Sequence, residues 1–456
     1  MPEPLPETKA THMTEMPVDE ATTGSLHDLS IEAEEAGTEP KASSASSEVL
    51  PQTTTGGVPT MSGATGAVFA VSSVLGPVLG GIICDRTTWR WIFLLNVPCG
   101  VLVVLVILLS WPNSVDKRSL SLHKVSLTQI DYVGTILLMA ATVLLIVALQ
   151  EAGTATFSWS SSVTIGLLTA SGVSVLGLAG WIGFLENKGE KSPVTPTFPS
   201  RFLRQRVMST AFVVALFTGF PLFLTLIQLP ERFQIVNNTS PIGAGVRLMP
   251  LLFASAFGSS FAGFCSSRKN NTFWTLLGAS SLMLIGCGLM SSVSGSASVQ
   301  PSIYGYQVIF GLGIGMTFST VIILVSLEVE FRDFALALGI VNQARILGGV
   351  IGLAASTIIF NIRVGKDLPS VLDPSQIQSL RQTLNAVSSF TEPQQEAVRY
   401  TFAQSFNDQL RICMYISAAC WIITWACWSK TPADLAKRKE AHDAMIEGRE
   451  GTSSTE

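Results

Sequence analysis

Ten long apolar runs divide this chain and constrain its fold more than any other feature. They lie at residues 64–84, 92–111, 131–150, 163–185, 207–229, 243–264, 273–293, 303–327, 337–360 and 408–428. A helix of roughly 20 residues is long enough to cross the hydrocarbon layer of a bilayer. Unpaired backbone groups in lipid are too costly for open sheets, so each run must be helical. The sequence therefore predicts an all-α, polytopic membrane protein with about ten transmembrane helices.

The segments at the two ends carry much of the charge. Residues 1–60 contain eleven acidic and two basic residues. Such a segment cannot bury enough apolar surface to order itself, so we expect a disordered acidic tail. Residues 429–456 form a second polar tail. The net charge of −4 is small and gives no reason to expect a nucleic-acid partner.

Metal and ATP chemistry find no support in the sequence. The four histidines lie in polar segments, and no pair has the spacing of metal ligands. The chain has no P-loop pattern, and its apolar runs hold no cluster typical of an enzyme. We therefore expect no metal, no cofactor and no enzymatic activity. Uphill transport by this chain would need a gradient or a separate ATPase.

Basic residues alternate between successive loops. Loop 186–206 carries five basic residues, whereas loops 151–162 and 294–302 carry none. The positive-inside rule then places both chain ends in the cytoplasm, which agrees with an even number of helices. The predicted outward loop 230–242 contains two overlapping glycosylation sequons, at Asn237 and Asn238. That loop is short and close to the membrane, so both residues are candidate acceptors only.

Residues 72–81, SSVLGPVLGG, carry the most specific motif of the chain. Gly76 and Gly80 lie one turn apart with Gly81 beside them, so another backbone can approach closely. Pro77 interrupts the hydrogen bonds of the helix and bends it. Gly and Pro are common in membrane helices in any case, but their density here favours a thin, bent helix where two bundles meet.

This stretch resembles the antiporter motif of the major facilitator superfamily, with Ser72 in place of the motif's first glycine. Further segments are similar to the fourteen-helix drug:proton antiporters, the TCR/Tet group of fungi: residues 89–98, 131–134, 245–250 and 342–352. The resemblance covers about residues 64–430. It implies a carrier that exports a small organic compound, such as a fungal secondary metabolite or toxin, while protons move inward. No targeting signal decides between the plasma membrane and the vacuole, and we expect the cell membrane.

One departure from that family concerns the position of the motif. The family carries it on the fifth helix, whereas here it lies on the first apolar run. The resemblance then implies an incomplete fold that lacks four helices. The expected parts are a disordered cytoplasmic tail (1–60), two helices of an N-terminal bundle (61–111), linker helices (112–206), a complete six-helix C-terminal bundle (207–428) and a cytoplasmic tail (429–456). The alternative is a truncated, transport-inactive protein or an incomplete gene prediction.

Such an incomplete fold has three structural consequences. The C-terminal bundle should be whole, and the linker helices should lie at its periphery. The two remaining N-terminal helices should leave a groove open to lipid or water, with the glycine face of 72–81 still packed on the C-terminal bundle. A closed bundle of ten helices would instead indicate a distinct fold.

A few polar side chains lie within the apolar runs and are candidates for the substrate pathway. Arg345 is the deepest cation, and a buried arginine must face protein or water. It binds an anionic or oxygen-rich solute, forms a structural hydrogen bond to a facing helix, or extends to the cytoplasmic interface. The other candidates are Asn342, Gln343, Gln228, Gln307 and Arg247. Five glycines are expected to be close-packing points: Gly311, Gly313, Gly315, Gly348 and Gly352.

No carboxylate lies near the middle of an apolar run. The nearest ones sit at the ends of runs: Asp131, Glu151, Glu186, Glu231 and Glu328. A proton-coupled carrier usually needs a titratable group within the membrane. The sequence therefore leaves the proton-coupling residue unassigned.

Overall fold

The structure is a computed structural model. It describes residues 72, 75–76, 79–83, 86–88, 90–110, 130–153, 159–188, 194, 196–267, 270–329, 333–382 and 390–429. Within these residues, nine helical spans are long and apolar enough to cross a membrane. They correspond to nine of the ten expected runs. The tenth run, 64–84, lies mostly outside the described residues, although residues 79–83 are helical. The predicted all-α membrane architecture is thus confirmed.

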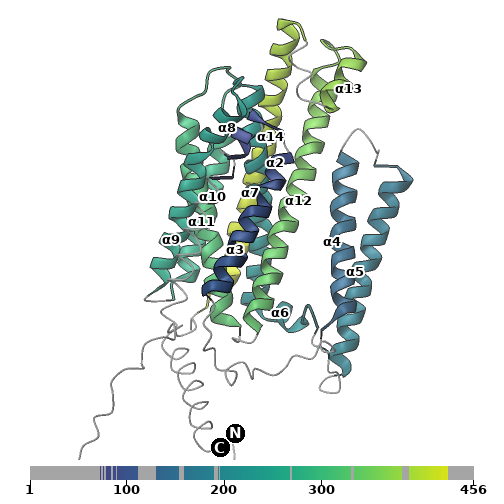
Figure 1. The fold of residues 1–456 in the computed structure, drawn as a ribbon, viewed down its shortest axis with the longest axis vertical. Coiled ribbons are helices and arrows are strands. Elements are labelled where there is room, and N and C mark those ends of the chain that lie inside the picture. Colours follow the sequence, from purple (N-terminus) through teal and green to yellow (C-terminus); the bar gives the residue numbers. More distant parts are fainter. Residues whose placement is uncertain are drawn as a thin grey trace, which may run out of the picture. The chain divides into compact units, whose positions relative to one another are not determined.

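The spans follow one another along the chain (Figure 1). They are α2 (Arg90–Leu94) with α3 (Asn96–Ser110), α4 (Tyr132–Gly153), α5 (Ser162–Lys188), α7 (Arg206–Ile235), α8 (Pro241–Arg247) with α9 (Met249–Ser267), α10 (Thr272–Met290), α11 (Ser302–Glu328), α12 (Phe334–Asp367) and α14 (Glu392–Thr424). Two shorter helices, α6 (Ser200–Arg204) and α13 (Pro374–Gln382), lie in the connections.

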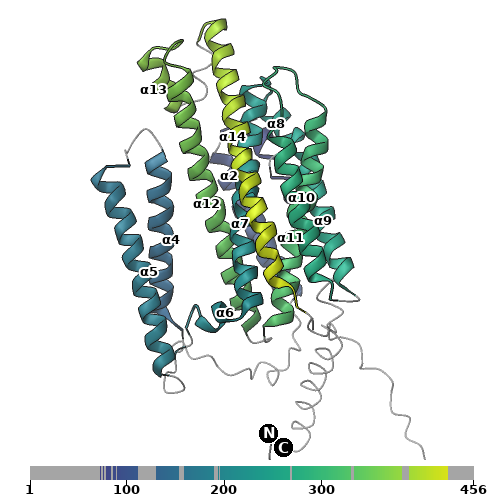
Figure 2. The same ribbon diagram turned by 180° about the vertical axis from the view of Figure 1, so that it is seen from behind.

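Six of these helices, from α7 to α14, pack on one another through a shared core. α7 packs on α12 and α11 packs on α9, while α14 contacts both α7 and α10 (Figure 2). Large side chains such as Phe233, Met283 and Phe310 are fully buried between them. Lipid tails are as apolar as these side chains, so close van der Waals packing holds the helices together.

Glycines make that close packing possible. A Cβ atom at Gly315 would overlap the carbonyl oxygen of Ser255 on α9, and one at Gly313 would lie 2.5 Å from the backbone nitrogen of Met283 on α10. Gly311 of α11 and Gly348 and Gly352 of α12 meet neighbouring backbones in the same way. The close-packing role predicted for all five glycines is confirmed.

Helices α4 and α5 form a hairpin, and α4 also contacts α12. Asp131, immediately before α4, accepts hydrogen bonds from the Gly134 N–H (2.7 Å), the Trp181 Nε1–H of α5 (2.8 Å) and the Thr197 N–H (3.0 Å). Burial raises the pKa of this carboxyl. The hydrogen bonds from Thr197, Gly134 and Trp181 outweigh burial, so the pKa lies below its ordinary value of 3.8. Asp131 thus ties both helices to the segment before α6.

Helices α2 and α3 differ from the others because none of their residues is buried. Their side chains are almost all large and apolar, and Leu109 is 82% exposed. The whole surface of α3 is therefore available to lipid or to other protein.

Helices α12 and α14 extend into the segment between the expected apolar runs at 337–360 and 408–428. Helix α12 continues to Asp367, and α14 begins at Glu392, well before the apolar run at 408. These extensions bury one apolar face in a small separate cluster, which includes Val364, Leu368, Leu380, Phe390 and Val398. A hydropathy scan misses them because their opposite face is polar.

Candidate functional site

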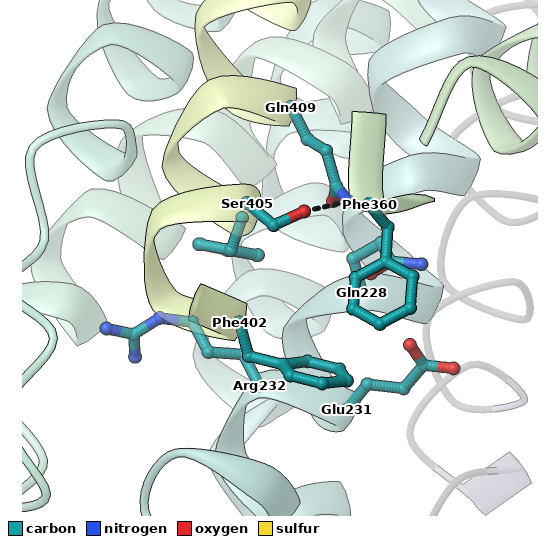
Figure 3. A pocket seen from close by; sticks show the side chains of 8 residues that line it. Gln228, Glu231, Arg232, Phe360, Phe402, Ser405 and Gln409 are labelled. Carbon is teal, nitrogen blue, oxygen red and sulfur yellow. Dashed lines mark hydrogen bonds between the residues drawn. The ribbon is translucent and has the colours of Figure 1, made fainter. Parts of the chain in front are cut away.

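A small pocket opens where α7 ends and where α12 and α14 extend beyond the apolar runs. We call this the outer end of the bundle, following the prediction from loop charge. The lining residues come from three helices: Gln228, Glu231, Arg232, Phe360, Phe402, Ser405, Phe406 and Gln409 (Figure 3). The free volume is about 10 Å³, close to the space that one water molecule needs.

Glu231 brings a carboxylate to this pocket. Helix α7 continues through Pro230 to Ile235, so Glu231 lies inside the helix and not in the expected loop 230–242. Among the described residues, its carboxylate forms no hydrogen bond and no ion pair. Figure 3 shows the Glu231 carboxylate and the Arg232 guanidinium pointing in opposite directions. The sequence neighbours therefore do not neutralise each other.

Arg232 is held by its own partners on the other side of α7. It is 4% exposed, and its Nη2 donates to the Ser294 carbonyl oxygen at 2.7 Å. The guanidinium also lies 5.3 Å from the ring centre of Phe406 on α14. Arg232 falls within the loop expected at 230–242. The buried Phe233 and Val236 that follow it are the signal that the helix continues.

Gln409 forms the opposite wall of the pocket. Its Nε2 donates to the Ser405 hydroxyl (3.2 Å) and to the Ser356 carbonyl oxygen (3.3 Å). Its Oε1 is buried and has no hydrogen-bond partner among the described residues. Gln228, a residue singled out from the sequence, lines the same pocket. The pocket therefore combines a carboxylate, two amides and a hydroxyl with aromatic rings.

Two other predicted residues lie inside the bundle and away from this pocket. Arg345 of α12 is 4% exposed, and its guanidinium lies 4.1 Å from the ring centre of Phe318 on α11. Its Nε and Nη2 have no hydrogen-bond partner among the described residues. Gln307 of α11 is fully buried, and both polar atoms of its amide are likewise without a partner in the described part of the chain.

The remaining pathway candidates are less buried. Asn342 is exposed and Gln343 is half-buried on α12. Arg247 is half-buried at the end of α8, where its Nη1 donates to the Gly243 carbonyl oxygen at 3.1 Å. Of the six pathway candidates, Gln228 alone lines the described pocket, and the role of all six stays a prediction.

The glycine motif lies only partly within the described residues, and Pro77 is outside them. A Cβ atom at Gly76 or Gly80 would meet no described atom within 4 Å. At Gly81 it would lie 3.2 Å from the Cα of Ile242 on α8. Close approach to the six-helix bundle is therefore seen at Gly81, and the packing role of Gly76, Gly80 and Ser72 stays a prediction.

The two sequon asparagines have different surroundings. The Asn237 Nδ2 donates to the carbonyl oxygens of Ala297 (3.1 Å) and Ser296 (3.3 Å). Asn238 is exposed and has a φ of 47°, in the left-handed region. Asn238 is therefore more exposed than Asn237, which is half-buried and hydrogen-bonded.

The chemistry that these residues offer is binding and proton exchange. No cluster of three potential metal ligands occurs in the part of the chain that the structure describes. A carboxyl group beside amides can bind a proton, a water molecule or a polar group of a solute.

Residues 43–353 match the family model described as "Major Facilitator Superfamily". The chain is 34% identical over 361 residues to the MFS-type transporter FPY5 of Fusarium mangiferae, which covers 77% of this chain and 60% of that protein. It is 31% identical over 353 residues to the MFS-type efflux pump LUC4 of a Fusarium species. This alignment covers 77% of this chain and 59% of that protein. It is 30% identical over 322 residues to the Aspyridones efflux protein of Neocamarosporium betae. This alignment covers 69% of this chain and 55% of that protein.

The chain therefore spans between 55% and 60% of the length of these three relatives. Among solved structures, an inward-facing bacterial homologue of the human lysosomal transporter Spinster aligns with a TM-score of 0.41 and 12% identity. That alignment covers 83% of this chain and 88% of the other. A likeness of this size adds nothing to the family comparison.

Proposed function

Because the chain belongs to the major facilitator superfamily, we propose that it exports a small organic compound across a membrane in exchange for protons. It is a multi-pass membrane protein, and its family consists of transporters and not enzymes. The observation that carries the export direction is its similarity to relatives described as efflux proteins. By the same similarity, the proposed cargo is a fungal secondary metabolite or toxin.

The proposed proton exchange is supported by the resemblance of residues 72–81 to the antiporter motif. Rocking of helix bundles about a central site would move the solute, as in other secondary transporters. Arg345 is the proposed contact for an oxygen-rich group of the solute, since its guanidinium is buried with donors to spare. The proposed location is the cell membrane, with both chain ends in the cytoplasm.

A second candidate function is that of a membrane protein without transport activity of its own. The observation that favours it is the complete exposure of α3, which buries no residue. A transporter needs two bundles that enclose a solute, and α3 encloses nothing by itself. This candidate rests on the proposal that residues 61–111 are part of an N-terminal bundle.

Expression in yeast cells that lack their own drug exporters separates the two candidates. The cells would be loaded with rhodamine 6G, then with other small, largely apolar compounds, and retention would be measured over time. Export predicts lower retention than in cells carrying the empty vector. Equal retention for every compound, with the protein shown in the membrane fraction, would favour the inactive candidate. Gly348→Leu, which should force α12 away from α7, provides the inactive control.

A further inference from the structure

The carboxylates that the structure describes near the ends of the spans differ in what compensates their charge. Asp131 accepts hydrogen bonds from three residues, and Glu186 accepts two from Ser200. Asp408 pairs with Arg363, whose Nη2 lies 2.6 Å from its Oδ2. Glu231 has no such partner among the described residues, although it is half-buried and lines the pocket. A carboxylate in that position loses hydration without receiving a counter-charge.

The charged groups nearest to the pocket do not supply that counter-charge. Arg232 of α7 points away and donates to Ser294. Arg363 of α12, one turn beyond Phe360, is paired with Asp408 and Asp367. Arg399 of α14, one turn before Phe402, forms no ion pair with Glu231. The rest of the lining is neutral: amides, a hydroxyl and aromatic rings.

The pocket does hold a partner for the protonated form of Glu231. The Oε1 of Gln409 is a buried acceptor without a donor among the described residues, and Gln409 is only 1% exposed. A protonated carboxyl group has one O–H donor, whereas a carboxylate has none. The cavity has space for about one water molecule, which can bridge the two groups. Protonation of Glu231 thus removes its uncompensated charge and supplies a hydrogen-bond donor for Gln409 Oε1.

We propose that Glu231 is a proton-binding residue at the outer end of the bundle, an inference that rests on the proposed proton exchange. A hydronium ion in the outer water gives its proton to the carboxylate and leaves a water molecule. The neutral carboxyl then donates to Gln409 Oε1, directly or through that water. When the proton leaves, the carboxylate is restored, so the group can serve one proton per transport cycle.

Carbodiimide labelling of the wild-type chain tests this proposal without a substituted protein. Dicyclohexylcarbodiimide reacts with carboxyl groups that are protonated and lie in apolar surroundings. The full chain in liposomes would be treated across a range of pH, digested, and examined by mass spectrometry. We expect label on Glu231 that is lost as the pH rises. Glu396, an exposed carboxylate on the extension of α14, is the internal control and should stay unlabelled. Labelling of Glu231 no greater than that of Glu396 at every pH would overturn the proposal.

Substituted chains add an independent readout. Glu231→Gln keeps the shape of the side chain and removes its proton-binding capacity, and Glu396→Gln is the matched control. We expect export of rhodamine 6G by the wild type and by Glu396→Gln to depend on outer pH, and that dependence to be lost in Glu231→Gln. An unchanged pH profile in well-folded Glu231→Gln would contradict the proposal.

The two measurements separate the failure of this proposal from the failure of the proposed function. Label on Glu231 in a chain that exports nothing would support the proton site and count against export. Proton-driven export by a chain whose Glu231 resists labelling would overturn the proton site and leave the function standing.

Discussion

A Cβ atom at Gly348 of α12 would overlap the carbonyl oxygen of Leu216 on α7, so these helices touch through their backbones. We predict that Gly348→Leu forces them apart and lowers the free energy of unfolding by about 1–3 kcal/mol, the usual cost of overpacking. Thermal unfolding of the purified protein in detergent would measure the change. Gly339→Leu is the matched control, because Gly339 is exposed on the same helix with no described atom within 4 Å. Similar melting temperatures for the two variants would show that the contact at Gly348 is not tight.

Asp131 should make stability depend on pH. Its pKa is lowered in the folded protein from the ordinary value of 3.8, since the hydrogen bonds from Thr197, Gly134 and Trp181 outweigh burial. A lowered pKa contributes stability that is present above the ordinary value and is lost as the pH falls through the folded value. We predict that Asp131→Asn melts below the wild type at neutral pH, and that this difference narrows below pH 3.8.

The expected loss at neutral pH is about 1.5–3 kcal/mol, which is typical of hydrogen bonds to a charged group. Melting curves of the two proteins across the pH range would measure it. A constant difference at all pH values would mean that the charge of Asp131 is unimportant.

Much of the helical architecture was predictable, because a span must be apolar along its whole length. The positions at which the helices begin and end were not predictable in this way. The apolar run ends at residue 229, and Pro230 and two charged residues follow it, yet α7 continues to Ile235. The start of α14 did have a local signal: Thr391 caps the helix and forms a capping box with Gln394 of its first turn.

The pocket around Glu231 could not be predicted in the same way. Gln228, Phe360 and Gln409 come from three helices that are far apart in the sequence. Hydropathy says which residues lie in a membrane but not which helices touch. Gln228 was identified as a polar residue in an apolar run, whereas Gln409 at the start of the last run gave no such signal.

Arg345 and Arg247 should differ in their effect on export. The Arg345 guanidinium is enclosed in the bundle beside Phe318, whereas Arg247 is half-buried and donates within its own helix. We predict that Arg345→Ala lowers the export rate more than Arg247→Ala does. Rates of rhodamine 6G efflux, normalised to protein in the membrane, would compare them. Equal and mild losses would assign Arg345 to a structural role.

Glycosylation, where it occurs, is predicted at Asn238 and not at Asn237. The amide nitrogen of Asn237 is engaged by Ser296 and Ala297, whereas Asn238 is exposed. The protein expressed in yeast should shift in mobility after treatment with peptide-N-glycosidase F. Asn238→Gln should remove that shift and Asn237→Gln should keep it. A shift that survives in Asn238→Gln would contradict the assignment.

Transport in inside-out membrane vesicles tests the central claim most directly. The vesicle lumen corresponds to the outside of the cell, so acidifying it imposes the proton gradient that would drive export. We predict that vesicles with the wild-type chain accumulate rhodamine 6G when the lumen is acidic. Accumulation should stop when nigericin collapses the gradient, and it should be absent with Gly348→Leu. Accumulation equal to that of vesicles without the protein, for rhodamine 6G and for every other compound tried, would contradict the account.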